Sequence, residues 1–144
     1  MKTLLSLALV FASMVFVHAG WTTDYKAALV QAKAQKKLVL LDFTGSDWCG
    51  YCKLLEKEAL SQQKFKDFAE ANYILVRVDF PRQTPLSDDL KQQNESLKSQ
   101  FKVHIYPTLI VLDRDGIEVG RQEGYYPNTT PDSEIARLKK LNKN

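Results

Sequence analysis

The segment LVLLDFTGSDWCGYCK, Leu38 to Lys53, contains both cysteines of a chain of 144 residues. Its first half, Leu38 to Phe43, is an apolar run that predicts a short strand buried on both faces. The polar residues that follow indicate a loop, and a helix is expected to begin at Cys49. Cys52 then lies one helical turn further along, within reach of a disulfide with Cys49.

The placement of the two cysteines favours chemistry over stabilisation. A disulfide that closes so small a loop excludes few unfolded conformations, so it adds little to the free energy of unfolding. A helix N terminus presents unpaired N–H groups and the positive end of the helix dipole, and both stabilise a thiolate at Cys49. Cys49 can attack a substrate disulfide, and Cys52 can then resolve the mixed disulfide. The sequence therefore predicts thiol–disulfide exchange.

The first 19 residues are typical of a secretory signal peptide. Lys2 precedes an apolar run from Leu4 to Val17, and Ala19 ends a small-residue cleavage site. The run is shorter than the roughly 20 residues that span a bilayer. We therefore expect a leader at 1–19, one domain at 20–144, and a periplasmic or secreted protein.

Length and charge narrow the class of protein further. Residues 20–144 are enough for one domain to bury a core without metal ions or structural disulfides. The formal net charge of +3 is small and evenly spread, which does not indicate a nucleic-acid partner. A single domain without a dimerisation segment predicts a monomer.

Hydrophobic periodicity predicts an alternation of helices and strands. A helix is expected within 21–37, behind the candidate caps Thr22 and Thr23. The expected later elements are strands at 38–43, 73–79, 108–112 and 117–122, and helices at 49–60, 61–71, 87–101 and from 131 onward. The first two strands should be parallel and the last two should form a hairpin, which gives a mixed α/β sheet with helices on both faces. The early helices are expected to bury Leu54, Leu55, Ala59, Phe65 and Phe68.

The motif DFTGSDWCGYCK, with Tyr106-Pro107-Thr108 further along the chain, resembles the thioredoxin superfamily, and the element order matches over residues 36–142. The resemblance implies a thioredoxin fold, β-α-β-α-β-β-α, with a mixed sheet of four to five strands flanked by helices, and an extra N-terminal helix. It implies Cys49 as the nucleophile and Cys52 as the resolving thiol. It also implies protein thiols and disulfides as substrates, with no cofactor beyond the cysteine pair.

The resemblance implies roles for further residues. Asp42, the one acid in an otherwise apolar strand, would be the buried carboxylate that exchanges a proton with Cys52. Pro107 would be a cis-proline beside the cysteines, since a cis bond costs little before proline. Substrate contacts would come from Trp48, Tyr51, Tyr106 and Pro107.

The sequence also departs from the thioredoxin pattern. Asp42 stands seven residues before Cys49, one more than thioredoxins usually have. Leu75 occupies the strand position that often carries a lysine near the buried acid. Residues 81–99 form a longer segment than in a minimal thioredoxin and are expected to remodel one rim of the substrate groove.

Tyr51 bears on the direction of electron flow, because it supplies no positive charge where strong oxidants have a histidine. We therefore expect a reductase or an isomerase rather than an oxidase. A reductase would need an electron donor, such as a membrane reductase or a small-molecule thiol.

Two alternatives remain open at this point. Some thioredoxin-like proteins bind copper through two cysteines and a distant histidine, and His104 lies three residues before Pro107. Alternatively, the fold could present a peptide groove in which the thiols are incidental. A tetrahedral zinc site is not expected, since two cysteines and the single histidine after residue 19 supply fewer than four ligands.

Overall fold

A computed structural model describes residues 20–142 of the chain. The predicted signal peptide at 1–19 lies outside the described residues. The fold is a four-stranded sheet with the order β2-β1-β3-β4, formed by β1 (Leu38–Thr44), β2 (Tyr73–Asp79), β3 (Thr108–Leu112) and β4 (Glu118–Glu123). β1 pairs with β2 in parallel, whereas β1 with β3 and β3 with β4 are antiparallel, which confirms the predicted mixed sheet.

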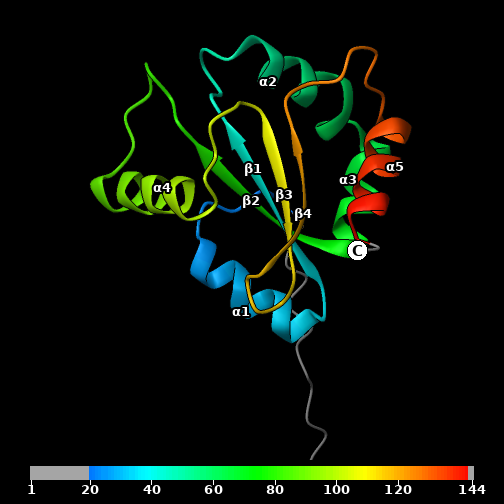
Figure 1. Cartoon of the computed structure of the whole chain (residues 1–144), viewed down its shortest axis with the longest axis horizontal. Helices are drawn as coiled ribbons and strands as arrows, with labels where there is room; N and C mark the ends of the chain where they lie inside the picture. The colour runs from blue at the N-terminus through cyan, green and yellow to red at the C-terminus, as the bar shows by residue number, and fades with distance from the viewer. Residues whose placement is uncertain (1–19, 143–144) are drawn as a thin grey trace, which may run out of the picture.

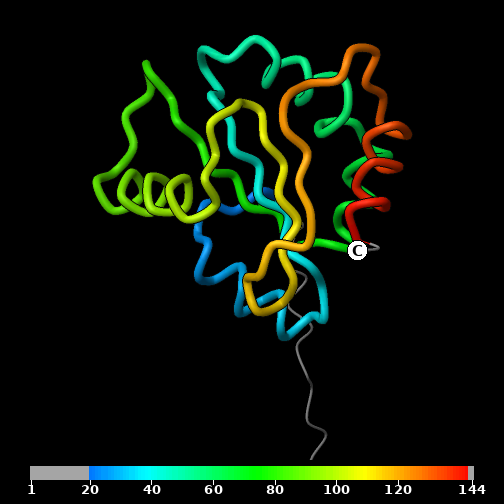
Figure 2. Tube along the Cα trace, in the orientation of Figure 1, coloured from blue at the N-terminus to red at the C-terminus, as the bar shows by residue number. Residues whose placement is uncertain are grey.

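The helices lie on both faces of the sheet, as the alternation of elements predicted (Figure 1). One face carries α1 (Tyr25–Gln35) and α4 (Asp88–Gln100). The other face carries α2 (Gly50–Leu55), the π-helix η1 (Glu56–Leu60), α3 (Gln63–Asn72) and α5 (Pro131–Leu141). The chain trace in Figure 2 shows β1 running up the middle of the sheet and continuing directly into the segment before α2. None of the helices within residues 20–142 is long and apolar enough to cross a membrane.

The hydrophobic core has two halves, one on each face of the sheet, because side chains alternate along a strand. Val39, Leu41 and Phe43 of β1 join the half under α1 and α4. Leu40 joins the half under α2, α3 and α5. All four side chains are fully buried, and each contributes about 2 kcal/mol of hydrophobic stabilisation. The central strand is thus fixed from both sides.

Residues ahead of α1 cover the outer edge of the sheet. Thr22 pairs with Val76 in an isolated parallel bridge, and its backbone bonds to Leu75 and Arg77 of β2. Asp24 caps α1 by accepting the N–H of Ala27. The prediction of Thr22 or Thr23 as the cap was wrong, because the chain at Thr22 is still extended along β2 and the helix begins later.

The predicted inward direction of Leu54 was also wrong, since 38% of its surface is exposed. Cys52 and Leu55 face the core, and each helical residue turns the chain by about 100°. Leu54 therefore lies on the opposite side of α2 from Cys52. Leu55, Ala59 and Phe65 are buried as predicted, and Phe68 is half-buried.

The neighbours Leu54 and Leu55 provide a matched test of this packing. Leu55→Ala is expected to lower the free energy of unfolding by about 2–5 kcal/mol, because it leaves a cavity under α2. Leu54→Ala is expected to lower it by less than about 1 kcal/mol. Urea unfolding of both variants measures the difference, and equal losses would contradict the orientation described for α2.

Candidate active site

Cys49 and Cys52 form a disulfide at the start of α2, with their Cα atoms 5.2 Å apart. Cys49 is the N-cap residue of the helix, and the N–H of Cys52 donates a hydrogen bond to the Sγ of Cys49 over 3.3 Å. Both cysteines are largely buried, with 7% and 5% of their surfaces exposed. This N–H and the positive end of the helix dipole both stabilise a thiolate at Cys49 once the disulfide is reduced.

Trp48 is held beside the cysteines by three neighbours. Its Nε1–H donates to the carbonyl oxygen of Phe80 over 2.8 Å. Its ring meets the ring of Tyr106 edge to face, with 5.9 Å between the centroids. The ring also lies directly against the backbone of Gly45, where a Cβ atom would clash with it. Glycine at this position therefore leaves room for the indole.

The segment before β3 lies next to Trp48. The peptide bond between Tyr106 and Pro107 is cis, and Pro107 is buried while Tyr106 is half-buried. The Tyr106 ring also contacts Phe80, with the centroids 5.5 Å apart. The structure thus brings together Trp48, Tyr106 and Pro107, three of the four residues from which substrate contacts were predicted.

Tyr51, the fourth predicted contact residue, lies on the outer side of the site with 63% of its surface exposed. Its ring stacks on Tyr125, which comes from the segment between β4 and α5, at a centroid distance of 5.6 Å. The hydroxyl of Tyr125 donates a hydrogen bond to the carboxylate of Glu58. Nothing in the sequence pattern pointed to Tyr125, because it is distant from the cysteines along the chain.

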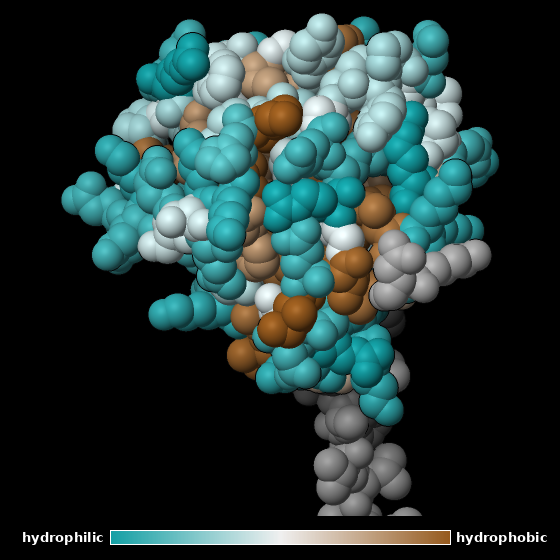
Figure 3. Space-filling model, viewed as in Figure 1, coloured by the Kyte–Doolittle hydropathy of each residue, from teal (hydrophilic) through white to brown (hydrophobic). Residues whose placement is uncertain are grey.

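Some of the exposed apolar side chains belong to segments of the site. On the face shown in Figure 3, small groups of hydrophobic residues lie among hydrophilic ones. Among the described residues, the large hydrophobic side chains that are exposed are Val30, Tyr51, Leu54, Ile105, Ile117 and Tyr126. Tyr51 lies between the cysteines, Ile105 precedes Tyr106, and Tyr126 follows Tyr125. Three of the six therefore belong to the segments that form the site.

Asp42 is buried in the middle of β1, with 2% of its surface exposed. Its Oδ2 forms an ion pair with the Arg77 guanidinium at 3.1 Å, and Oδ1 has no hydrogen-bond partner among residues 20–142. Burial raises the pKa of Asp42 to about 7. The Arg77 guanidinium lowers this pKa in part, and the Glu56 carboxylate adds to the rise. The carboxyl group can therefore hold or release a proton near neutral pH.

The cationic partner of Asp42 is Arg77, which the sequence analysis did not single out. Leu75, the expected equivalent of a lysine, pairs with Leu40 and lies in the core. Arg77 lies opposite Asp42 in the parallel register of β1 and β2. Arg77 is the only charged residue inside the run YILVRV, and this could have marked it as a candidate partner for the buried acid. The strand register was needed to pair it with Asp42.

Arg77 connects the buried acid with a cavity beside the cysteines. Its guanidinium also bonds to Glu56 over 2.9 Å and lies 4.3 Å from the ring centroid of Trp21. Arg77, Glu56 and Cys52 line the same cavity of about 330 Å³. Asp42 is therefore linked, through Arg77, to the space next to Cys52.

Within residues 20–142, no group of three or more histidine, cysteine, aspartate or glutamate side chains is arranged to hold a metal ion. His104 is exposed on the segment between α4 and β3.

These features define a thioredoxin-type domain with a pair of cysteines at the start of a helix and a cis-proline segment beside them. The family model of the thioredoxin-like domain matches residues 25–139. The chain belongs to this family.

Known proteins that resemble the chain carry disulfide-exchange names. The disulfide bond reductase DsbH of Chlamydia pneumoniae is 37% identical over 72% of this chain and 62% of its own length. The thiol:disulfide interchange protein DsbD of Pseudomonas fluorescens is 30% identical over 74% of this chain and 18% of its own length. The chain thus spans less than two thirds of either relative. A solved structure of a DsbH oxidoreductase aligns with a TM-score of 0.79 at 30% identity, covering 98% of this chain and 94% of that one.

The raised pKa of Asp42 predicts a pH dependence of stability. In the folded chain this pKa is about 7, whereas an unfolded aspartate titrates near pH 4. The contribution of the protonated carboxyl to stability is therefore complete below about pH 4 and is lost as the pH rises through 7.

Asp42→Asn cannot ionise, so this variant should lack the pH dependence that Asp42 gives to stability. Between pH 5 and pH 8, the free energy of unfolding of the wild type is expected to fall by about 2 kcal/mol more than that of the variant. Urea unfolding at the two pH values measures both losses. Equal losses in the two proteins would contradict a raised pKa at Asp42.

Proposed function

We propose that this protein is a thiol–disulfide oxidoreductase that acts on protein disulfides through Cys49 and Cys52. The observation that carries the proposal is the position of Cys49 as helix N-cap, with the N–H of Cys52 directed at its sulfur. Membership of the thioredoxin-like family and similarity to proteins named for disulfide reduction and interchange support it.

The reaction begins from the reduced dithiol. The Cys49 thiolate attacks one sulfur of a substrate disulfide, the substrate S–S bond breaks, and the departing sulfur takes up a proton. The deprotonated Cys52 then attacks the Cys49 sulfur and releases the second substrate sulfur, which is also protonated. The substrate gains two electrons and two protons, and the protein is left with the Cys49–Cys52 disulfide.

Asp42 is proposed to accept the proton that Cys52 loses. A carboxyl group with a pKa of about 7 is matched to this task at neutral pH. Its unpartnered Oδ1 and its link through Arg77 to the cavity beside Cys52 support the role.

The substrate is proposed to bind as an extended segment across Trp48, Tyr51, Tyr106 and Pro107. Trp48 and Tyr106 are in contact, and Tyr51 presents an exposed ring on the other side of the cysteines. Aromatic rings of this kind contribute contact area with little loss of side-chain entropy.

We propose a reductase or isomerase rather than an oxidase. The uncharged Tyr51 between the cysteines supports this direction, as does the similarity to a protein named disulfide bond reductase. Regeneration of the dithiol then requires an electron donor, either a membrane reductase or a small-molecule thiol. The cysteine pair serves as the redox centre, and no other cofactor is proposed.

A periplasmic or secreted location is proposed from the signal-peptide pattern at 1–19. In such a compartment disulfides form readily, and a protein that reduces or rearranges them has substrates. We further propose that the domain acts as a monomer and has no nucleic-acid partner.

Serine variants of the two cysteines test the assignment of roles. The wild type is expected to accelerate the reduction of insulin by dithiothreitol. Cys49→Ser is expected to abolish this acceleration, because the nucleophile is lost. Cys52→Ser is expected to accumulate a mixed disulfide with insulin, detectable by mass spectrometry. Full turnover by Cys49→Ser would contradict the role assigned to Cys49, and retention of a partner without any turnover by the wild type would indicate a peptide-binding module.

The reduction potential tests the proposed direction. Equilibration with glutathione or dithiothreitol series is expected to give a value nearer to about −270 mV, as in thioredoxin, than to about −120 mV, as in strong oxidants. A value near the second figure would make the protein an oxidant. Absence of exchange combined with tight copper binding that His104→Ala weakens would favour a copper carrier instead.

A further inference from the structure

The segment between β2 and α4 is fastened to the loop that precedes the cysteines. The carboxylate of Asp47 accepts the backbone N–H groups of Arg82, Gln83 and Thr84 over 2.9, 2.7 and 3.1 Å. These bonds, led by the one from Arg82, hold the pKa of Asp47 below its ordinary value. The longer segment predicted to remodel a rim of the groove is therefore fixed beside the site.

Two cations of this region lie on the aromatic rings of the site. The Arg82 guanidinium lies 3.8 Å from the ring centroid of Trp48. The Lys98 ammonium, from α4, lies 5.3 Å from the ring of Phe80 and 5.7 Å from that of Tyr106. Stacking on a ring orders a long cationic side chain before a ligand arrives, so less entropy is lost on binding.

Among the residues that the structure describes, neither cation is neutralised by a neighbouring carboxylate. Of the ion pairs formed within residues 20–142, none includes Arg82 or Lys98. The nearby carboxylates have other partners, since Asp47 holds three backbone N–H groups and Asp79 accepts from the N–H and the hydroxyl of Ser46. Both positive charges are therefore available to a ligand.

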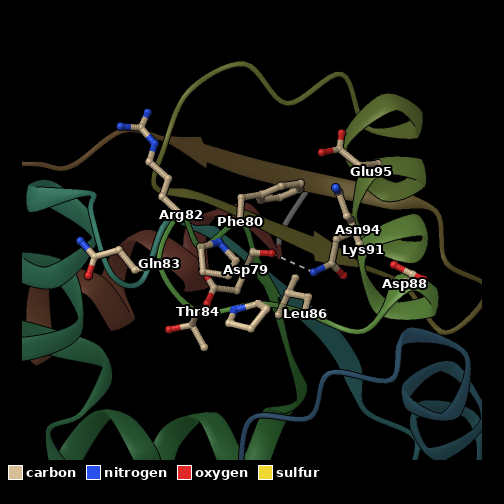
Figure 4. Close-up of a pocket in the computed structure, with 12 residues that line it drawn as sticks. Asp79, Phe80, Arg82, Gln83, Thr84, Leu86, Asp88, Lys91, Asn94 and Glu95 are labelled. Carbon is tan, nitrogen blue, oxygen red and sulfur yellow. Dashed lines mark hydrogen bonds between the residues drawn. The ribbon is translucent and has the colours of Figure 1, made fainter.

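Two of the three acids that line the adjoining cavity, Asp88 and Glu95, lie on its α4 wall, and the third is Asp79 at the end of β2. This cavity, of about 390 Å³, is lined by the segment around Arg82 and by α4 residues that include Asp88, Lys91 and Glu95. Figure 4 shows the Arg82 side chain pointing away from the cavity, while Asp88 and Glu95 project from α4 on the opposite side. The charge of Arg82 is thus directed toward Trp48 and the cysteine site.

We propose that Arg82 and Lys98 form a cationic rim that selects substrate segments with carboxylate side chains flanking the reacting disulfide. The inference rests on the proposed function and specifies its substrate class. The occupant is an acidic segment of a substrate protein, because its charge complements the two cations and its neighbouring side chains can contact Trp48 and Tyr106. The disulfide exchange itself is unchanged, and the rim acts on the association step.

Paired model substrates test this rim. Two self-quenched, disulfide-linked peptide dimers are compared, identical except for glutamates or glutamines on either side of each cysteine. With pre-reduced protein at low ionic strength, the second-order rate constant for reduction is expected to be about 3- to 10-fold higher for the glutamate peptide. The preference should shrink in about 0.5 M NaCl, because salt screens exposed charges.

Variants assign the preference to the two residues. Arg82→Gln and Lys98→Gln should each reduce the ratio of the two rate constants, and the double variant should bring it near one. Lys26→Gln, an exposed lysine of α1, removes the same charge elsewhere and should leave the ratio as in the wild type. Thermal unfolding of each variant checks that the fold is retained.

The outcomes separate the rim from the proposed function. Equal reduction of both peptides by the wild type, or an undiminished preference in the double variant, would overturn the rim and leave the oxidoreductase intact. If the wild type reduces neither of the two peptides nor insulin, the proposed function is overturned and the rim with it.

Discussion

The position of β1 in the middle of the sheet is the constraint on which the site depends. Because β1 is parallel to β2, both strands end at the same edge, and the loop before Cys49 meets the loop after Asp79. Because β1 is antiparallel to β3, the same edge also receives the start of β3 at Thr108. Three segments distant in sequence therefore converge there, and the contacts of Trp48 with Phe80 and Tyr106 join them.

The same strand carries a group that opposes folding. A carboxyl buried in an apolar strand loses its hydration, and Arg77 compensates for only part of that loss, so the pKa of Asp42 stays high. The proton exchange proposed for this residue would therefore come at a cost in stability, as is common where buried ionisable groups serve chemistry. Arg77 lies between Asp42 and Glu56 and forms an ion pair with each of them.

The surroundings of the cysteines differ between the two sides of the site. On one side, Arg82 and Lys98 lie over aromatic rings, and on the other the Tyr51–Tyr125 stack is tied to Glu58. Both sides are formed by segments outside the cysteine motif. The motif supplies the reacting sulfurs, whereas these segments determine which charges and rings a partner would meet. A shared fold is therefore compatible with different partners.

The sequence by itself determined the element order, the mixed sheet and the placement of Cys49 at a helix start, because periodicity, turn residues and the cysteine spacing are local signals. Only the tertiary structure paired Asp42 with Arg77, turned Leu54 outward, and stacked Tyr51 on Tyr125. It also brought Arg82 over Trp48. These outcomes depend on strand register, helix rotation and the meeting of distant loops, which are set by packing of the whole domain and have no signature within a short segment.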